Sequence, residues 1–324
     1  MTKIRSILLA AVSLLVAGAA YAQDYPTKPV RLVVPFAPGG ASDLVARIIS
    51  PGVIKELGQQ VVVDNRGGAS GNIGVEVVAR AAADGYTVLL GNIGTMAINP
   101  SLFPKFQVKP MRDLIAVTQV VDVPTALVVH SSVPVKTVKE FIEYAKGRPG
   151  KLNFGTAGAG SNGRLEMEIF MRQAGIELVH VPYKGGAGAA AIALLSGEVQ
   201  CSFQTLSSVM AHVNAGKLRV LGVAAAKRVG ALPDVPIMSE AGFASMKSGS
   251  WQGIYVPAGT PRPIVDKLFA AFTKVLGDAE VTKRLNDNGA EVVTSTSPEE
   301  FAGFMKAENE KWGQVLKQVG VVGE

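Results

Sequence analysis

Three glycine-rich turns hold the residues of this chain that are best suited to bind a small ligand. They span residues 35–43 (PFAPGGASD), 91–95 (GNIGT) and 155–161 (GTAGAGS), and each follows an apolar run of strand length. Glycines let a ligand approach main-chain N–H groups closely, and the amino ends of helices favour anions. One such turn is explained well enough as a tight connection. Three of them, interleaved with serine, threonine and asparagine, predict a site that holds an anion without arginine.

The turns connect strands and helices that alternate along the chain. Apolar, β-branched runs predict strands over residues 30–35, 60–63 and 86–90, with helices over 41–57 and 75–83. A second block predicts strands over 126–129, 152–154, 178–181, 199–203 and 218–224, with helices over 138–146, 165–173 and 189–195. Strands that are apolar throughout and separated by helices indicate a parallel sheet covered on both faces. Ligands bind at the carboxyl edge of such sheets, where these turns lie.

Two successive blocks of about a hundred residues predict two α/β lobes. A strand over residues 251–256 is expected to cross back, and helices over 263–276 and 298–319 close the chain. Pro51 and Gly52 lie inside the first helix and are expected to kink or split it, because proline lacks an N–H and its ring crowds the preceding turn.

A dinucleotide site is disfavoured. Residues 158–163 (GAGSNG) match the pattern GxGxxG, but that fingerprint needs an acidic residue at the end of the next strand, roughly 20 residues on. The strand ends near Tyr183 and Lys184 with no acid, and no Walker A sequence is present. No cofactor is expected.

A hydrolase is an alternative that rests on Ser161. Residues 159–163 (AGSNG) resemble a degenerate nucleophile elbow, and His180 and His212 follow. His180 lies in an apolar strand, where a hydrogen-bonded structural role is more common than that of a base. Glu166 and Glu168 are two residues apart on a helix and point to different faces, so a solvated face explains them. We therefore favour a binding protein over an enzyme.

Composition excludes several classes of protein. Of the 324 residues, 48% are hydrophobic and 18% charged, as in globular proteins. One cysteine and three histidines cannot build a disulfide framework or a cysteine-rich zinc site, and no metal is expected. Cys201 lies within a predicted strand, where a buried small hydrophobe is its expected role. The net charge of +6 is spread without a basic run, which argues against nucleic acid.

The first 22 residues predict a cleaved signal peptide. Lys3 and Arg5 precede an uncharged apolar run, and the sequence Ala-Tyr-Ala at residues 20–22 offers a cleavage site. An uncleaved membrane anchor is the alternative, but a spanning helix needs ~20 apolar residues. No cysteine follows the apolar run, so a lipid anchor is excluded. We expect an exported, soluble protein that starts at Gln23.

Several short segments, taken in order, resemble the substrate-binding receptors of tripartite tricarboxylate transporters, the Bug family of periplasmic proteins. They are residues 29–43 (PVRLVVPFAPGGASD), 61–74 (VVVDNRGGASGNIG), 83–86 (ADGY), 154–161 (FGTAGAGS), 181–185 (VPYKG), 232–236 (LPDVP) and 257–261 (PAGTP). Each segment alone is weak evidence for this family, whereas the order and spacing of the segments over nearly the whole mature chain are specific to it.

The resemblance implies a two-lobed periplasmic binding protein fold of type II, an α/β fold with the ligand cleft between its lobes. It implies a small carboxylate ligand held by main-chain N–H groups, hydroxyls and ordered water. Carried over by position, the contacts from the first lobe are Gly39, Gly40, Ala41, Ser42, Asp43, Asn92 and Thr95, and those from the second lobe are Thr156, Ala157, Gly158 and Ser161. The Asp43 side chain has two equal interpretations, as a ligand contact or as a group that caps a helix.

Three residues depart from the family pattern. Arg164 stands where histidine is common, and it is either a surface residue or an added cation near the ligand. Ala191 and Gln204 stand where aspartate is frequent. Since an aspartate in the cleft can pair with a ligand ammonium and the neutral amide of Gln204 cannot, we expect a ligand without a free α-amino group.

These observations predict a monomeric periplasmic receptor that delivers a small carboxylate to a membrane permease. Residues 23–124 and 250–324 are expected to form the first lobe and residues 125–249 the second, with hinges near 121–124 and 248–251. The lobes close around the ligand, which stabilises the closed state. The alternatives are an exported hydrolase that uses Ser161 and a ligand sensor that feeds a signalling partner.

Overall fold

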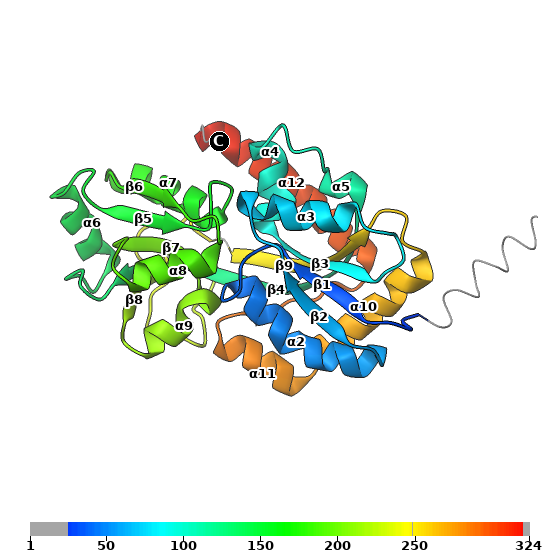
Figure 1. The fold of residues 1–324 in the computed structure, drawn as a ribbon. Helices are drawn as coiled ribbons and strands as arrows, with labels where there is room; N and C mark the ends of the chain where they lie inside the picture. The colour runs from blue at the N-terminus through cyan, green and yellow to red at the C-terminus, as the bar shows by residue number, and fades with distance from the viewer. Residues whose placement is uncertain (1–24, 248, 320–324) are drawn as a thin grey trace, which may run out of the picture.

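A computed structural model of the protein describes residues 25–247 and 249–319, which form two α/β lobes side by side (Figure 1). The predicted signal peptide lies outside these residues. The first lobe contains β1 (Val30–Val34), β2 (Val61–Asn65), β3 (Thr87–Asn92), β9 (Gly249–Pro257) and β10 (Glu291–Val292). The second contains β5 (Asn153–Thr156), β6 (Val179–Pro182), β7 (Cys201–Thr205) and β8 (Leu218–Ala224). The strand β4 (Leu114–His130) belongs to both.

Helices cover both faces of the sheet in the first lobe. They are α2 (Ala41–Leu57), α3 (Asn72–Ala79), α4 (Asn99–Leu102), α5 (Pro110–Asp113), α10 (Arg262–Leu276), α11 (Ala279–Asp287) and α12 (Pro298–Val319). Leu32 and Val34 of β1 pack with α2 and α10 on one face, and Val33 packs with α3 and α12 on the other. Burial on both faces explains why this strand is apolar at every position except the half-buried Arg31, which pairs with Asp64.

The second lobe repeats this layering. Its helices are α6 (Val138–Lys146), α7 (Asn162–Ala174), α8 (Ala187–Leu195) and α9 (Leu206–Asn214). Phe141 of α6 and Phe170 of α7 pack on one face of the sheet, and Leu194 of α8 and Val209 of α9 pack on the other. Among the described residues, no helix is both long and apolar enough to cross a membrane.

The sheet is mixed, which corrects the prediction of a parallel sheet. The strand predicted at residues 126–129 is the end of the 17-residue strand β4. Its first part pairs antiparallel with β9, and from Thr125 onward it pairs antiparallel with β7 and β8. Thr118, Gln119 and Asp122 interrupt the apolar pattern of this strand, so the sequence pattern predicted only its last part. Parallel pairing is retained between β1 and β2, β1 and β3, β5 and β6, and β5 and β7.

The first helix is continuous, so the predicted split at Pro51 is wrong. The helix α2 runs from Ala41 to Leu57 with Pro51 inside it. The proline is exposed, so its ring lies on the solvent side of the helix. The next residue, Gly52, packs directly on α10, where an added Cβ would lie 2.7 Å from Val275. Close packing along the buried face therefore compensates for the loss of the helical hydrogen bond that proline cannot donate.

Cys201 is fully buried in β7, as the sequence predicts, and this has a measurable consequence. Burial raises the pKa of its thiol far above the ordinary value, and Sγ lies 3.7 Å from the carbonyl oxygen of Asn153. Because the thiolate is the reactive form, a thiol reagent is expected to leave the folded protein unlabelled and to label one thiol per chain after unfolding in guanidinium. Rapid labelling of the folded protein would contradict this burial.

Candidate functional site

A small cavity lies between the two lobes where the turns predicted to bind a ligand meet. Its volume is ≈ 50 Å³. It is lined by Phe36, Gly40, Ala41, Ser42, Ser70, Asn92, Gly94, Ala157, Gly160, Ser161, Asn162, Ala187, Thr205 and Ser250. None of these lining residues has a charged side chain. The cavity is therefore bounded by main chain, hydroxyls, two amides and a few apolar groups.

Four helices begin at this cavity. Gly40, Ser161 and Thr205 are the residues that precede α2, α7 and α9, and Ala187 is the first residue of α8. At none of these four amino ends does the side chain of the preceding residue cap the helix by accepting a hydrogen bond from its first turn. The first turn of a helix has N–H groups without an intrahelical partner and a partial positive charge. Four such ends around one cavity make it suited to an anion.

Six of the predicted contact residues line the cavity, namely Gly40, Ala41, Ser42, Asn92, Ala157 and Ser161. The sequence prediction missed the other eight. Phe36, Gly94 and Gly160 lie inside the three glycine-rich turns, so they could have been identified by including every residue of each turn. Ser250 comes from β9, and no local motif in the sequence singled it out.

Seven predicted contacts lie elsewhere than in the cavity lining: Gly39, Asp43, Thr95, Thr156, Gly158, Arg164 and Gln204. Their contribution to binding remains a prediction. For several of them the structure gives another function, which the hydrogen bonds define.

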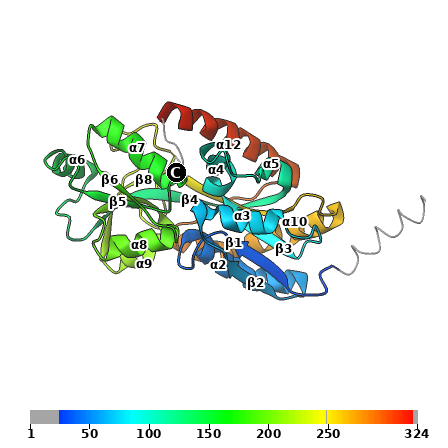
Figure 2. The same cartoon turned by 45° about the horizontal axis from the view of Figure 1, so that its top comes forward.

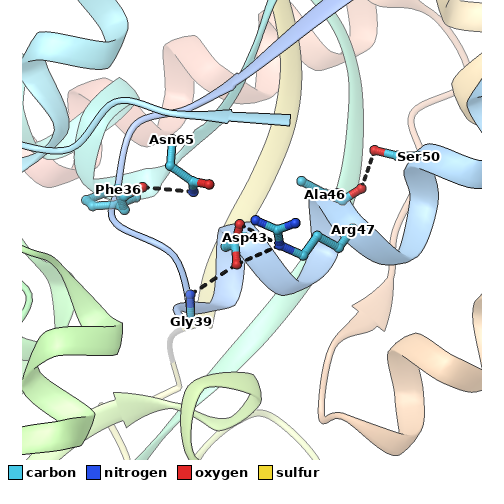
Figure 3. A network of polar contacts seen from close by, with 7 residues as sticks. All are labelled: Phe36, Gly39, Asp43, Ala46, Arg47, Ser50 and Asn65. Carbon is cyan, nitrogen blue, oxygen red and sulfur yellow. Dashed lines mark hydrogen bonds and ion pairs between the residues drawn. The ribbon is translucent and has the colours of Figure 1, made fainter. Parts of the chain in front are cut away.

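Asp43 shapes the turn before α2 (Figure 3). Its carboxylate accepts a hydrogen bond from the main-chain nitrogen of Gly39 at 3.0 Å and from Nε of Arg47 at 3.0 Å. Burial alone would raise the pKa of Asp43, but the hydrogen bonds from Arg47 and Gly39 hold that pKa below its ordinary value. Asn65 supports the same turn, because its amide nitrogen donates to the carbonyl oxygen of Phe36 at 3.0 Å. The carboxylate of Asp43 therefore stabilises the turn that places Gly40 in the cavity wall.

Thr95 fixes a second turn of the first lobe. The main-chain nitrogen of Asn92 donates to Oγ1 of Thr95 at 3.0 Å, and the main-chain nitrogen of Thr95 donates to Oδ1 of Asn92 at 3.1 Å. This reciprocal pair orients Asn92, which lines the cavity. Thr95 itself is fully buried behind it.

Thr156 is bonded to His180 in the second lobe. Oγ1 of Thr156 lies 2.7 Å from Nε2 of His180, and it donates to the carbonyl oxygen of Gly158 at 3.2 Å. The hydroxyl of Ser161 donates to the same carbonyl oxygen at 2.8 Å. Ser161 and His180 thus bond to other groups in this structure and do not form the nucleophile–base pair that a hydrolase would need.

The environment of His180 predicts an unusual titration. Burial, together with the positive charge of Arg164, lowers the pKa of His180 from 6.5 to about 4. Its imidazole is expected to stay neutral down to that pH, which a histidine NMR titration would measure. Because the unfolded chain takes up this proton near pH 6.5, the free energy of unfolding should fall as the pH decreases from 6.5 to 4. A midpoint near 6.5 in the folded protein would contradict this environment.

Three charged residues of α7, Arg164, Glu166 and Glu168, do not line the cavity. Nε of Arg164 is 3.8 Å from Oε1 of Glu168, and both side chains are mostly buried. Glu166 is also buried, and Oγ1 of Thr125 donates to its Oε1 at 2.6 Å. The expectation that Glu166 and Glu168 form a solvated face is therefore wrong for Glu166. The hydrogen bond to Thr125 of β4 explains how the structure accommodates this carboxyl.

The two lobes touch closely through glycines beside the cavity. A Cβ added at Gly188 would lie 3.0 Å from Pro38, Gly39 and Gly40 main-chain atoms. A Cβ added at Gly160 would lie 2.0 Å from Oδ1 of Asn99. Glycines thus permit the two lobes to approach each other closely beside the cavity.

A second groove between the lobes has different chemistry. Its volume is ≈ 690 Å³, and its lining includes Asp122, Lys227, Arg228 and Glu291. Nζ of Lys227 lies 2.7 Å from Oε1 of Glu291, so an ion pair bridges it. Because Asp122, Asp287 and Glu291 also line this groove and their carboxylates would repel an anion, the uncharged cavity at four helix amino ends is the better candidate for an anion site.

Comparisons with known proteins agree with this geometry. The sequence profile of the family described as "Tripartite tricarboxylate transporter family receptor" matches residues 45–321. The protein BugT of Bordetella pertussis is 34% identical over 319 residues, which cover 97% of this chain and 97% of that protein.

Solved structures with similar folds include three with substantial sequence identity. The periplasmic binding protein BugD has a TM-score of 0.89 and 36% identity, covering 93% of this chain and 100% of its own. The protein Rpa4515 of R. palustris, solved with adipate, has the same TM-score, identity and coverage. MatC of Rhodopseudomonas palustris, solved with bound malate, has a TM-score of 0.84 and 34% identity, covering 90% of this chain and 100% of its own.

Proposed function

Because the chain belongs to the family of tripartite tricarboxylate transporter receptors, we propose that it captures a small carboxylate between its lobes and delivers it to a membrane permease. The chain has the two-lobed fold of type II periplasmic binding proteins that the resemblance implies. Its family is one of periplasmic solute-binding receptors. The carboxylate, the permease and the cleaved signal peptide are parts of the proposal.

The cavity at the amino ends of four helices carries this proposal. Unpaired main-chain N–H groups and helix dipoles stabilise negative charge without a counter-ion in the cavity. A carboxylate is the simplest small organic anion that accepts several such hydrogen bonds. Adipate and malate, the molecules found with two related proteins, are both dicarboxylates, which supports this chemical class.

Closure of the two lobes is the proposed mechanism. We assign residues 23–124 and 250–324 to the first lobe and 125–249 to the second, so that β4 and β9 cross between them. The pairs Val123–Ser250 and Pro124–Gly249 lie at this crossing, which supports a hinge there. A ligand that contacts both lobes favours the closed state by its additional contacts, and a permease would recognise that state.

A thermal-shift screen of residues 23–324 against carboxylates, amino acids and aromatic acids tests the proposal. A ligand that binds only the folded state raises apparent stability by ~2.7 kcal/mol at a hundredfold excess over its dissociation constant. We expect stabilisation by carboxylates that lack a free α-amino group and no consumption of the ligand over hours. Stabilisation by amino acids alone would contradict the proposed ligand, and consumption of the ligand would favour the hydrolase.

A further inference from the structure

Asn162 offers the cavity a hydrogen-bond donor that the protein does not use. It is the first residue of α7, it lines the cavity, and it is only 7% exposed. Among the residues that the structure describes, its amide nitrogen Nδ2 has no hydrogen-bond partner. Buried polar groups in proteins are almost always hydrogen-bonded, so a donor of this kind at a ligand cavity points to a ligand acceptor.

Gln252 offers both a donor and an acceptor on the facing lobe. It is fully buried in β9, and within the described part of the chain neither Nε2 nor Oε1 has a hydrogen-bond partner. Its cross-strand partner is Asn92, and Ser250 lies two residues earlier on the same face of the strand. Asn92 and Ser250 both line the cavity, so the side chain of Gln252 lies on the cavity side of the sheet, buried next to the lining and not part of it.

Gln204 is a third buried amide with an unpartnered Nε2 among the described residues, but its position differs. Thr205, the next residue, lines the cavity, and successive side chains of a strand point to opposite faces. Gln204 is therefore directed away from the wall that Thr205 forms. Asn162 and Gln252 remain as the pair beside the cavity, one from each lobe.

We propose that Asn162 and Gln252 form a neutral amide subsite that recognises a hydroxyl group of the ligand, so that the receptor prefers hydroxycarboxylates. This rests on the proposed function. A hydroxyl both donates and accepts hydrogen bonds, and it matches two unpartnered amide nitrogens and one amide oxygen. This match does not depend on which end of the Gln252 amide is taken as nitrogen, since both ends are unpartnered.

Other ligand groups match this subsite less well. A second carboxylate only accepts hydrogen bonds, so it would leave Oε1 of Gln252 unpartnered and place a negative charge beside it. An ammonium only donates, so it would leave both amide nitrogens unpartnered. A methylene group would leave all three atoms unpartnered, and a site that loses a polar partner in this way discriminates strongly against the analogue.

Matched ligand pairs test the proposal in the wild-type protein. Titration calorimetry of residues 23–324 would compare malate with succinate and lactate with propionate, pairs that differ by one hydroxyl. We expect the hydroxylated member of the better-binding pair to bind at least about tenfold more tightly. Equal affinities within each pair would overturn the subsite while leaving a carboxylate receptor intact. Absence of binding by every carboxylate would overturn the proposed function and the subsite together.

Variants then assign the preference to the two residues. Hydroxyl preference is the ratio of the affinities for the ligands with and without the hydroxyl. Gln252→Met and Asn162→Ala are each expected to lower this ratio toward 1, because affinity for the hydroxylated ligand falls much more than affinity for the other. Gln119→Met is the control, because Gln119 is a half-buried glutamine of β4 that pairs with Gly253 and therefore lies on the opposite face of the sheet from Gln252. Its hydroxyl preference should equal that of the wild type. An unchanged preference in both folded variants would overturn the assignment.

Discussion

Replacing Gly188 by valine is expected to weaken ligand binding by about 5- to 150-fold without loss of stability in the ligand-free protein. A Cβ at this position would lie 3.0 Å from three main-chain atoms of residues 38–40 in the other lobe. Overpacking of this kind costs about 1–3 kcal/mol, and under the proposed closure mechanism it acts only when the lobes are closed. Gly188 lies in α8 without a positive φ, so valine fits the helix backbone. Calorimetry and thermal unfolding measure the two effects separately.

Gly303→Val is the matched control for this experiment. Gly303 lies in α12 on the exposed side, and an added Cβ would meet nothing within 4 Å. Its affinity should equal that of the wild type, and Gly188→Ala should fall between wild type and Gly188→Val. Wild-type affinity in Gly188→Val would show that the lobes do not approach as closely as this structure has them when ligand is bound.

Replacing Glu308 by alanine is expected to destabilise the protein by about 2–4 kcal/mol, because two buried indoles lose their shared acceptor. Oε2 of Glu308 accepts hydrogen bonds from Trp251 at 2.9 Å and from Trp312 at 3.1 Å. Trp251 belongs to β9 and Trp312 to α12, so this carboxylate joins the last helix to a strand of the first lobe. The helix α12 lies beside α4 and α5 along that lobe (Figure 2). Guanidinium unfolding followed by tryptophan fluorescence measures the change.

Glu310→Ala controls for the loss of a glutamate from the same helix. Glu310 is exposed on α12, and we expect its replacement to change the free energy of unfolding by less than about 0.5 kcal/mol. If Glu308→Ala were equally mild, the two indole hydrogen bonds would contribute little and the attachment of α12 would depend on apolar packing.

The sequence predicted the site better where one local segment carried the signal. The turn before α2 could be identified because glycines, a strand and a helix follow one another within a few residues. The six predicted contacts that line the cavity all come from such segments. Ser250 could not be identified in this way, because it reaches the cavity only through the pairing of β9 with β4, which joins residues more than a hundred positions apart.

Long-range pairing also explains what the sequence missed in the fold. The strand β4 contains polar residues such as Thr118 and Asp122, and Thr118 finds a hydroxyl partner in Ser295, far along the chain. The pattern of a single segment does not reveal such partners, so only the apolar end of this strand was predicted. The nine-residue helices α9 and α11 were not predicted from the sequence either.

A crystal structure of residues 23–324 with the carboxylate that binds most tightly would test most directly whether the cavity between the lobes is the ligand site. We expect ligand density in the cavity between Gly40 and Ser161, with carboxylate oxygens within about 3.1 Å of main-chain nitrogens at the helix amino ends of both lobes. Ligand bound to one lobe alone, or in the groove bridged by Lys227 and Glu291, would contradict it.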